Sequence, residues 1–286
     1  MRELEIKNVC IIGAGAMGSG IAQLAATHGY NVSLVDLNEE ILEKAKASMA
    51  KNLNRFFVTK GKISNEEAKD ILNRIKLYTN RDEAIKDAHI VIEAVFEDMG
   101  LKQQLLSDLD EKCDIEVILA TNTSSLSVTE MALKSKNQER IVGIHFFNPA
   151  PVMKLIELIK GKNTSNEILE KAKNFSKSLN KTVVTVKDSP GFITTRLIYV
   201  LCNEAINMKR EGIASTEDID TAVKLAFNFP MGPLELSDLV GNDIYLHIGE
   251  YLTEKFGQQY QPSPLLNEMV KDNHIGRKSK KGFYNY

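Results

Sequence analysis

Residues 8–36 read NVCIIGAGAMGSGIAQLAATHGYNVSLVD: an apolar run, a glycine-rich turn, a helical stretch and a second apolar run. The turn at 13–18 has the spacing Gly-x-Gly-x-x-Gly, and Asp36 ends the second run, 18 residues after Gly18. In a strand–turn–helix–strand unit, such glycines allow close approach to a pyrophosphate, and an acid about 20 residues further on binds an adenosine ribose. The start of the helix offers N–H groups to the phosphates. We therefore predict a dinucleotide site formed by Gly13, Gly15, Ala16, Met17, Gly18 and Asp36.

Asp36 also predicts which nicotinamide cofactor the site takes. A carboxylate at this position accepts a hydrogen bond from a ribose 2′-hydroxyl and repels the 2′-phosphate of NADP. The next residues, 37–40, include two acids and no cation that would pair with such a phosphate. We therefore predict NAD as the cofactor. The alternative is a glycine turn that binds nothing, and the strand–turn–helix–strand context argues against it.

Composition narrows the class of protein. The chain has 286 residues, 43% of them hydrophobic and 26% charged, which predicts a globular protein of two domains. The net charge of −2 gives no basic field for nucleic acid, and no apolar run reaches the ~18 residues of a membrane span. The three cysteines and five histidines have no disulfide or metal-ligand spacing. We expect no metal, nucleic-acid or membrane partner, and a cytoplasmic location.

Apolar strands alternate with helices up to about residue 187. Near-continuous Val/Ile runs are typical of buried parallel strands. We expect strands at 9–12, 31–36, 89–95, 116–120, 140–144, 154–159 and 182–186. After Ser189-Pro190-Gly191 the pattern is mostly helical. The predicted fold class is α/β, a Rossmann-like, mostly parallel sheet followed by an all-helical C-terminal domain, with the domains at residues 1–187 and 188–286.

Residues 38–73 predict a helical hairpin inserted between the second strand and the next. Within it, residues 44–62 include six basic residues and no acidic one. Lys44, Lys51 and Arg55 are seven and four residues apart, so they share one helical face. This basic stripe is either a phosphate-binding surface or a solvated face that keeps the hairpin in solution.

Polar residues also follow two later apolar strands. Ser124 lies in Ala-Thr-Asn-Thr-Ser-Ser, residues 120–125, where it either serves a site at the strand's carboxyl end or caps the next helix. His145 ends the next apolar strand, and Glu157 lies inside the apolar run Leu-Ile-Glu-Leu-Ile. A carboxylate there is costly unless it is paired. A His145–Glu157 pair removes that cost and forms an oriented base for proton transfer. The alternatives are a satisfied core histidine and a glutamate facing outward on an edge strand.

Seven motifs carry a resemblance to a known family. They are GAGAMGSG, VIEAVFE, ATNTSSLS, HFFNPAPVMKLIELI, DSPGFITTR, FPMGPLELSDLVGND and GRKSKKGFYNY. In this order, between residues 7 and 286, they resemble the L-3-hydroxyacyl-CoA dehydrogenases, and most of all the short bacterial 3-hydroxybutyryl-CoA dehydrogenases. The resemblance implies a Rossmann-like NAD domain with a helical hairpin, and a helical C-terminal domain that forms a homodimer.

The same resemblance assigns roles to single residues. It implies that His145 is the acid/base, Glu157 its orienting partner and Ser124 the hydrogen-bond donor to the reacting oxygen. Asn122 helps to position the substrate and the nicotinamide. Three more residues match positions on the cofactor side: Glu93, Lys102 and Asn148.

An acyl-CoA thioester is the substrate that the resemblance implies. The hairpin of the family holds the 3′-phosphate end of CoA, and Asn52 and Lys60 fall near that surface, with Arg55 of the basic stripe between them. After Pro-Gly-Phe the family reads Val-Asn-Arg with the Asn in the active site, whereas this chain has Thr195 there. Thr195 is shorter and lacks the second function of an amide, so we expect it to bear on rate or substrate choice.

Two other functions stay open on the sequence. An NAD-dependent dehydrogenase of a polar hydroxy acid, such as an L-gulonate dehydrogenase, has similar NAD and His–Glu motifs but no use for a CoA-binding hairpin. A non-catalytic NAD-binding or structural protein is suggested only by Thr195. The presence of Ser124, His145 and Glu157 argues for catalysis.

Overall fold

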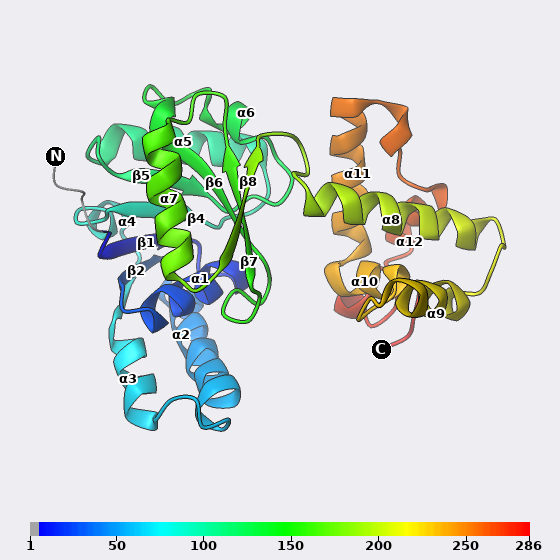
Figure 1. The fold of residues 1–286 in the computed structure, drawn as a ribbon, viewed down its shortest axis with the longest axis horizontal. Helices are drawn as coiled ribbons and strands as arrows, with labels where there is room; N and C mark the ends of the chain where they lie inside the picture. The colour runs from blue at the N-terminus through cyan, green and yellow to red at the C-terminus, as the bar shows by residue number, and fades with distance from the viewer. Residues whose placement is uncertain (1–5) are drawn as a thin grey trace. The chain divides into compact units, whose positions relative to one another are not determined.

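The computed structural model describes residues 6–286, and the chain divides into two compact units. The first unit ends at Asp188, and the second runs from Ser189 to Tyr286. In Figure 1 the first unit, coloured blue to green, is built around a sheet, and the second, coloured yellow-green to red, consists mainly of helices. Each unit has its own apolar core.

An eight-stranded sheet forms the centre of the first unit, in the order β3-β2-β1-β4-β5-β6-β7-β8. Neighbouring strands are parallel except β6 and β7, which are antiparallel. The predicted α/β class with a mostly parallel sheet is therefore confirmed. The strands are β1 (Asn8–Ile12), β2 (Asn31–Val35), β3 (Ile75–Tyr78), β4 (Ile90–Glu93), β5 (Ile118–Thr121), β6 (Ile141–Phe146), β7 (Leu155–Lys160) and β8 (Thr182–Lys187).

The central strands form where the sequence is apolar on both faces. Every residue of β4 (IVIE), β5 (ILAT) and β6 (IVGIHF) is buried, as expected for parallel strands covered by helices. β3 (IKLY) is not among the expected strands. It is a four-residue edge strand in which Ile75 is buried and Lys76 exposed, so it lacks the continuous apolar run of the others.

Helices of the first unit connect the strands and cover the sheet. They are α1 (Ala16–Thr27), α4 (Arg81–Ala84), α5 (Met99–Lys112), α6 (Val128–Ala132) and α7 (Asn166–Ser178). Leu24 of α1 and Phe175 of α7 pack into the same apolar core as the strands. Asp98, Ser127 and Ser165 each accept a backbone N–H in the first turn of α5, α6 and α7, so these helix starts are set by the sequence itself.

The predicted insertion is a helical hairpin. Its elements are α2 (Glu39–Leu53), a π-helical turn (Asn54–Val58) and α3 (Asn65–Asn73). Ser64 starts α3 with a reciprocal cap, in which its hydroxyl accepts from the Glu67 N–H and the Glu67 carboxylate accepts from the Ser64 N–H. Figure 1 shows both helices extending away from the sheet. The apolar side chains of α2 are three or four residues apart and enter the core, which leaves most of its basic side chains towards solvent.

The second unit packs its helices around a separate core. They are α8 (Thr194–Arg210), α9 (Thr216–Phe227), α10 (Pro233–Val240), α11 (Asn242–Phe256) and α12 (Pro264–Lys271). Tyr199 and Leu252 are among the buried residues of this core. Asp238 holds the C-terminal segment, because its carboxylate accepts the N–H groups of Phe283 (3.0 Å) and Tyr284 (2.9 Å).

Candidate active site

The carboxyl ends of the parallel strands meet at one edge of the sheet, and the predicted site residues follow them there. The glycine turn follows β1, Asp36 follows β2, and Ser124 lies just beyond β5, while His145 is near the carboxyl end of β6. β1 lies between β2 and β4, so the direction of winding reverses beside it. Open α/β sheets bind ligands in the crevice at such a switch point.

The glycines of the turn meet different steric demands. Gly13 has a φ of 98°, and a Cβ placed there would lie 2.7 Å from the Ala94 carbonyl oxygen. A Cβ at Gly18 would lie 1.7 Å from the Gly13 oxygen, whereas one at Gly15 would have no atom within 4 Å. Gly13 and Gly18 are therefore required by the packing of β1 and α1, and Gly15 faces open space in which a ligand fits.

Asp36 lies against the glycine turn. Its carboxylate accepts the N–H groups of Ala14 and Leu37, both at 2.7 Å. The first turn of α1 carries no acidic residue to compete for its N–H groups. A carboxylate just after β2, open space at Gly15 and the start of α1 together fit an NAD molecule with its ribose at Asp36 and its pyrophosphate at the helix start.

We expect replacement of Asp36 by alanine to raise the KM for NAD and to reduce the preference of the enzyme for NAD over NADP. The lost charge-assisted hydrogen bond is worth about 1.5–3 kcal/mol, which corresponds to roughly 10- to 100-fold in KM. Asp36→Asn is the matched variant, because its amide oxygen still accepts the Ala14 N–H while the charge is gone. The measurement is kcat/KM with both cofactors, and an unaltered enzyme that already prefers NADP contradicts the assignment.

His145 and Glu157 form the predicted pair. They face each other in the antiparallel register of β6 and β7, with His145 Nδ1 at 2.8 Å from Glu157 Oε2. His145 is 5% exposed and Glu157 1% exposed. β7 is flanked by β6 and β8, so Glu157 is not the outward-facing glutamate of an edge strand. A carboxylate that accepts from Nδ1–H orients the ring, and proton exchange with a substrate then falls to Nε2.

Ser124 belongs to a turn that is tied to the His145 strand. Asn122 Oδ1 accepts the Phe146 N–H at 2.9 Å, which joins the end of β5 to the end of β6. The cap of α6 is Ser127, whose hydroxyl accepts the Glu130 N–H at 3.2 Å. Ser124 is therefore not the capping residue, and its half-buried side chain lies in the loop between β5 and α6.

Glu93 and Lys102 form a buried ion pair below this turn. Lys102 Nζ lies 2.9 Å from both Glu93 carboxylate oxygens, and the Thr121 hydroxyl donates to the same carboxylate. Both charged side chains are 0% exposed. In this structure both side chains are enclosed by other groups of the first unit. The cofactor contact expected of them stays a prediction.

Glu97, from the same motif, is a carboxylate that is partly open to solvent, and it was not among the predicted residues. Its side chain is 37% exposed and lies 3.5 Å from Lys102 Nζ. The motif VIEAVFE offers two glutamates, Glu93 at the end of β4 and Glu97 in the loop after it. The signal that separates them is position, because a residue inside a fully buried strand is enclosed while a loop residue at the carboxyl edge is accessible.

Asn148 is exposed in the loop that follows β6. Lys181 holds this loop, since its Nζ donates to the carbonyl oxygens of Ala150 (2.8 Å) and Met153 (2.6 Å). Burial lowers the pKa of Lys181 from its usual value. The cofactor contact expected of Asn148 stays a prediction.

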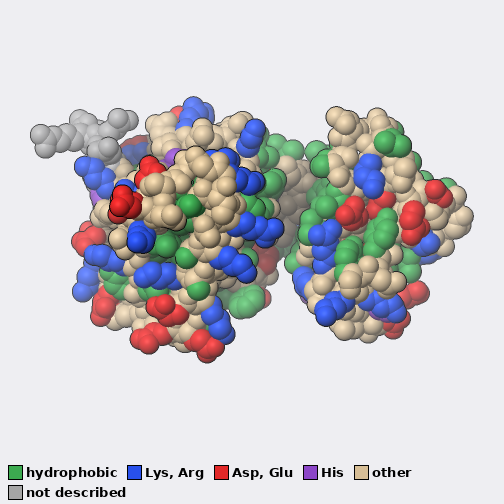
Figure 2. All heavy atoms as spheres, turned by 90° about the horizontal axis from the view of Figure 1, so that it is seen from below, with side chains coloured by type: hydrophobic (Ala, Val, Ile, Leu, Met, Phe, Trp, Pro, Cys, Tyr) green, Lys and Arg blue, Asp and Glu red, His purple; other side chains and the backbone are tan. Residues whose placement is uncertain are grey.

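The basic side chains of the hairpin differ in their contacts. Lys44 Nζ lies 2.6 Å from Glu40, so its charge is already paired. Arg55 and Lys60 instead lie on the Phe56 ring, 5.2 and 5.8 Å from its centroid, on and just after the π-helical turn. Asn52 is half-buried at the end of α2. Figure 2 shows the first unit from below, with blue Lys and Arg side chains interspersed with red carboxylates, so any phosphate site there rests on local pairs rather than on a uniformly basic face.

Thr195 lies in the first turn of α8, in the second unit, and is buried. Its expected contribution to substrate choice stays a prediction.

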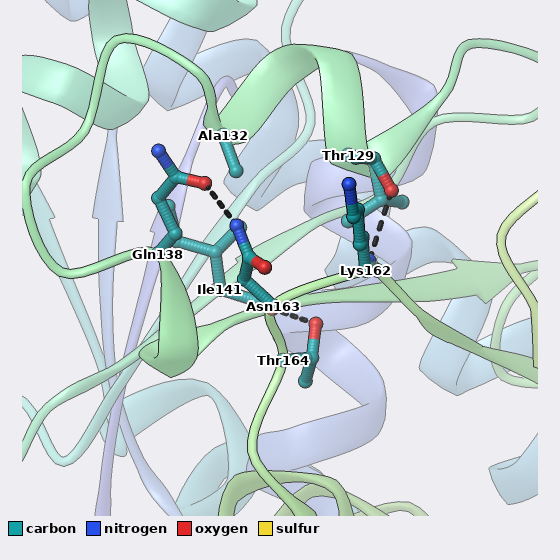
Figure 3. Close-up of a pocket in the computed structure, with 9 residues that line it drawn as sticks. Thr129, Ala132, Gln138, Ile141, Lys162, Asn163 and Thr164 are labelled. Carbon is teal, nitrogen blue, oxygen red and sulfur yellow. Dashed lines mark hydrogen bonds between the residues drawn. The ribbon is translucent and has the colours of Figure 1, made fainter.

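Two hollows of the first unit lie away from these residues. Figure 3 shows a small one beside α6, whose lining groups bond to one another: Asn163 Nδ2 donates to Gln138 Oε1 (2.7 Å), and the Thr164 hydroxyl donates to the Ile141 carbonyl (2.6 Å). Another, of about 240 Å³, lies at the amino ends of β1, β2 and β3, opposite the glycine turn. Within residues 6–286, no helix has the length and apolarity to cross a membrane, and no cluster of His, Cys, Asp or Glu could hold a metal ion.

Comparison with protein families gives matches across both units. The model described as "3-hydroxyacyl-CoA dehydrogenase, NAD binding domain" matches residues 8–189, and "3-hydroxyacyl-CoA dehydrogenase, C-terminal domain" matches residues 191–286. The chain is 44% identical to the 3-hydroxybutyryl-CoA dehydrogenase of Clostridioides difficile, over 97% of this chain and 99% of that protein. It is 41% identical to the mitochondrial hydroxyacyl-coenzyme A dehydrogenase of Homo sapiens, over 100% and 93%.

Solved structures agree with this similarity. The (S)-3-hydroxybutyryl-CoA dehydrogenase PaaH1 of Ralstonia eutropha is 42% identical with a TM-score of 0.94, covering 99% of each chain. FadB2 of M. tuberculosis is 37% identical with a TM-score of 0.94, covering 98% of this chain and 99% of that one.

Proposed function

The chain belongs to the 3-hydroxyacyl-CoA dehydrogenase family, a family of NAD-dependent oxidoreductases, and on this basis we propose that it interconverts (S)-3-hydroxybutyryl-CoA and acetoacetyl-CoA. The observation that carries the proposal is the buried His145–Glu157 pair. It lies at the edge of the sheet where the glycine turn and Asp36 form an NAD-fitting site.

His145 is the residue that moves a proton. NAD, when bound, supplies the acceptor for the hydride from C3 in oxidation and the donor in reduction. As the hydride leaves C3 in oxidation, the C3 hydroxyl proton passes to His145 Nε2, and Glu157 stabilises the imidazolium through Nδ1. In reduction the imidazolium returns this proton to the oxygen at C3. No other proton acceptor is needed for the balance.

Ser124 and Asn122 support this proton transfer in the proposal. The Ser124 hydroxyl donates a hydrogen bond to the C3 oxygen, where negative charge develops during reduction. Asn122 aligns the turn with the His145 strand through its bond to the Phe146 N–H. Both groups come from the same loop after β5.

Direct assay tests the proposed function. Acetoacetyl-CoA with NADH is expected to give turnover, followed by the loss of nicotinamide absorbance, and NADPH is expected to be poorer. Gulonate with NAD is the control for a polar hydroxy-acid dehydrogenase. Turnover of gulonate without turnover of acetoacetyl-CoA would falsify the proposal, and no turnover of either favours a non-catalytic protein.

The hairpin is proposed to bind the phosphates of CoA. Arg55 and Lys60 flank Phe56, so two cations and an aromatic ring lie together on an exposed turn. Phosphates pair with such cations, and an aromatic ring offers a stacking surface to a base. Asn52 adds an amide at the end of α2. If the turn is instead only a solvated face, substitutions in it should affect the KM of full-length and truncated thioesters equally.

We expect neutralisation of Arg55 and Lys60 together to raise the KM for acetoacetyl-CoA and to leave kcat nearly unchanged. Exposed phosphate contacts are screened by salt, so KM in the unaltered enzyme rises with ionic strength and the double variant loses part of that dependence. Lys44→Gln is the matched control, because Glu40 already pairs Lys44. The KM of a substrate truncated at the pantetheine should not change with any of the three substitutions. An equal change in KM for the truncated and the full thioester indicates that the turn is only a solvated face.

The second unit is proposed to form a homodimer. Leu197 and Val200 on α8 and Leu225 and Phe227 on α9 are exposed apolar side chains, and their number on one small unit is typical of an interface. Sedimentation of the purified chain checks this proposal. We also propose a cytoplasmic location, because the three cysteines are unbridged, as in a reducing compartment.

A further inference from the structure

Four donors of the Ser124 turn converge on one oxygen of Glu97. The Thr123 hydroxyl donates to Oε1 at 2.6 Å and the Ser124 N–H at 2.8 Å. The N–H and the hydroxyl of Ser125 donate to the same oxygen at 3.1 and 3.2 Å. A single neutral acceptor does not suit four donors, but a carboxylate does.

The other side of Glu97 rests on the buried ion pair. Glu97 Oε2 lies 3.5 Å from Lys102 Nζ, which is itself held by Glu93. Because Glu93 and Lys102 are enclosed, they form a rigid base for a side chain that is partly open to solvent. The link between β4 and α5 is also tight, since the Asp98 N–H donates to the Phe96 carbonyl at 2.8 Å.

Thr123 carries the contact from Glu97 into the backbone of the turn. Its hydroxyl accepts the Leu126 N–H at 3.1 Å and the Ser125 N–H at 3.4 Å while it donates to Glu97. Thr123 is 0% exposed, so it touches no ligand. The conformation of residues 123–126 therefore depends on Glu97 through Thr123 as well as directly.

From these contacts we infer that Glu97 is a positioning residue for Ser124: its carboxylate fixes the turn so that the Ser124 hydroxyl points at the reacting oxygen. The inference rests on the proposed function of this site. A donor aligned in advance stabilises developing charge without reorganisation. A misplacement of about 1 Å can cost about 100-fold in rate, so loss of the carboxylate is expected to cost about 10- to 100-fold in kcat.

The test combines Glu97→Gln with Ser124→Ala. A glutamine keeps the size of the side chain but loses the charge. Its NH2 group must point either at Lys102 or at the donors of the turn, so it faces other donors in both orientations. We expect Glu97→Gln to lower kcat for acetoacetyl-CoA reduction by about 10- to 100-fold in the unaltered background. In the Ser124→Ala background the further loss should be within about twofold, because coupled residues are not additive.

Thr123→Val keeps the inference falsifiable if Glu97→Gln folds poorly. It removes a hydroxyl that no ligand can reach, so a few-fold loss of kcat that disappears in the Ser124→Ala background supports positioning through the turn. Glu111→Gln, an exposed carboxylate at the other end of α5, is the matched control and should keep full kcat. Thermal unfolding of each variant shows that the comparison is made between folded enzymes.

Three outcomes overturn the inference. Losses that multiply across Glu97→Gln and Ser124→Ala mean that the two residues act independently. A fall in NADH affinity, measured by fluorescence titration, that equals the fall in kcat means that Glu97 serves the cofactor instead. If Ser124→Ala keeps full kcat, Ser124 has no catalytic role through which Glu97 could act. If the unaltered chain does not turn over acetoacetyl-CoA, the proposed function is contradicted instead. This assay is therefore run before the variants are compared.

Discussion

Replacement of His145 by alanine is expected to lower kcat by about 10²–10⁴-fold, the usual contribution of general acid–base catalysis. The imidazole is the group assigned to take the hydroxyl proton in oxidation and to return it in reduction. NADH affinity should be nearly unchanged, because the glycine turn and Asp36 are separate from β6. The measurement is kcat with acetoacetyl-CoA beside the Kd for NADH from fluorescence. His247→Ala, at an exposed histidine of α11, is the control and should keep full activity.

Glu157→Gln keeps the imidazole of His145 and removes the negative charge of its partner. The amide oxygen can still accept from His145 Nδ1–H, but it no longer stabilises the imidazolium by charge. We expect a smaller loss of kcat than for His145→Ala for this reason. Near-normal kcat in both variants means that the base of the reaction lies elsewhere.

Removal of the Arg140 guanidinium is expected to destabilise the first unit by about 3–5 kcal/mol, because it leaves a buried carboxylate without its cation. Arg140 Nε lies 2.9 Å from Asp110 Oδ1, and the two side chains are 3% and 1% exposed. Arg140 also donates to the Asp110 backbone carbonyl at 2.6 Å. This pair joins α5 to the start of β6, the strand that carries His145.

Urea unfolding of Arg140→Ala measures this loss. Lys136→Ala is the matched control, because the Lys136–Glu111 pair is 77% and 58% exposed, and exposed pairs contribute only about 0–1 kcal/mol. A variant at Arg140 that unfolds at the same urea concentration as the unaltered enzyme contradicts the expectation. The kcat of the folded variant at low temperature should stay close to normal, since Arg140 belongs to no proposed catalytic contact.

The same pair predicts how stability depends on pH. Burial acts to raise the pKa of Asp110, but hydrogen bonds from Asn137, Arg140 and the Lys136 N–H outweigh it and hold the pKa below its usual value. A carboxyl with a lowered pKa in the folded state stabilises the fold above the pKa of the unfolded state, about 3.9, and this stability is lost as the pH falls. The unaltered enzyme should therefore lose more stability than Arg140→Ala between neutral pH and acid.

Local patterns in the sequence were enough to predict the fold class. The glycine turn with Asp36, the fully apolar strands and the capped hairpin depend on residues close together in the chain, and each was found where it was expected. The His145–Glu157 pair was also predicted, because a carboxylate inside an apolar strand needs a partner. The edge strand β3 was missed, since its alternation over four residues is too short to distinguish from a loop.

Residue spacing alone predicts which residue types stand at the carboxyl edge of the sheet, whereas contacts between distant segments set which of them act together. Ser127 rather than Ser124 caps α6, Lys44 is paired while Arg55 and Lys60 share a ring, and Glu97 rather than Glu93 meets the Ser124 turn. Each outcome depends on which of two similar side chains faces a segment elsewhere in the fold. Sequence spacing sets the face of a strand or helix, but the path of a loop, and so the contacts of Glu97 with residues 26 to 28 positions away, exists only after the sheet has formed.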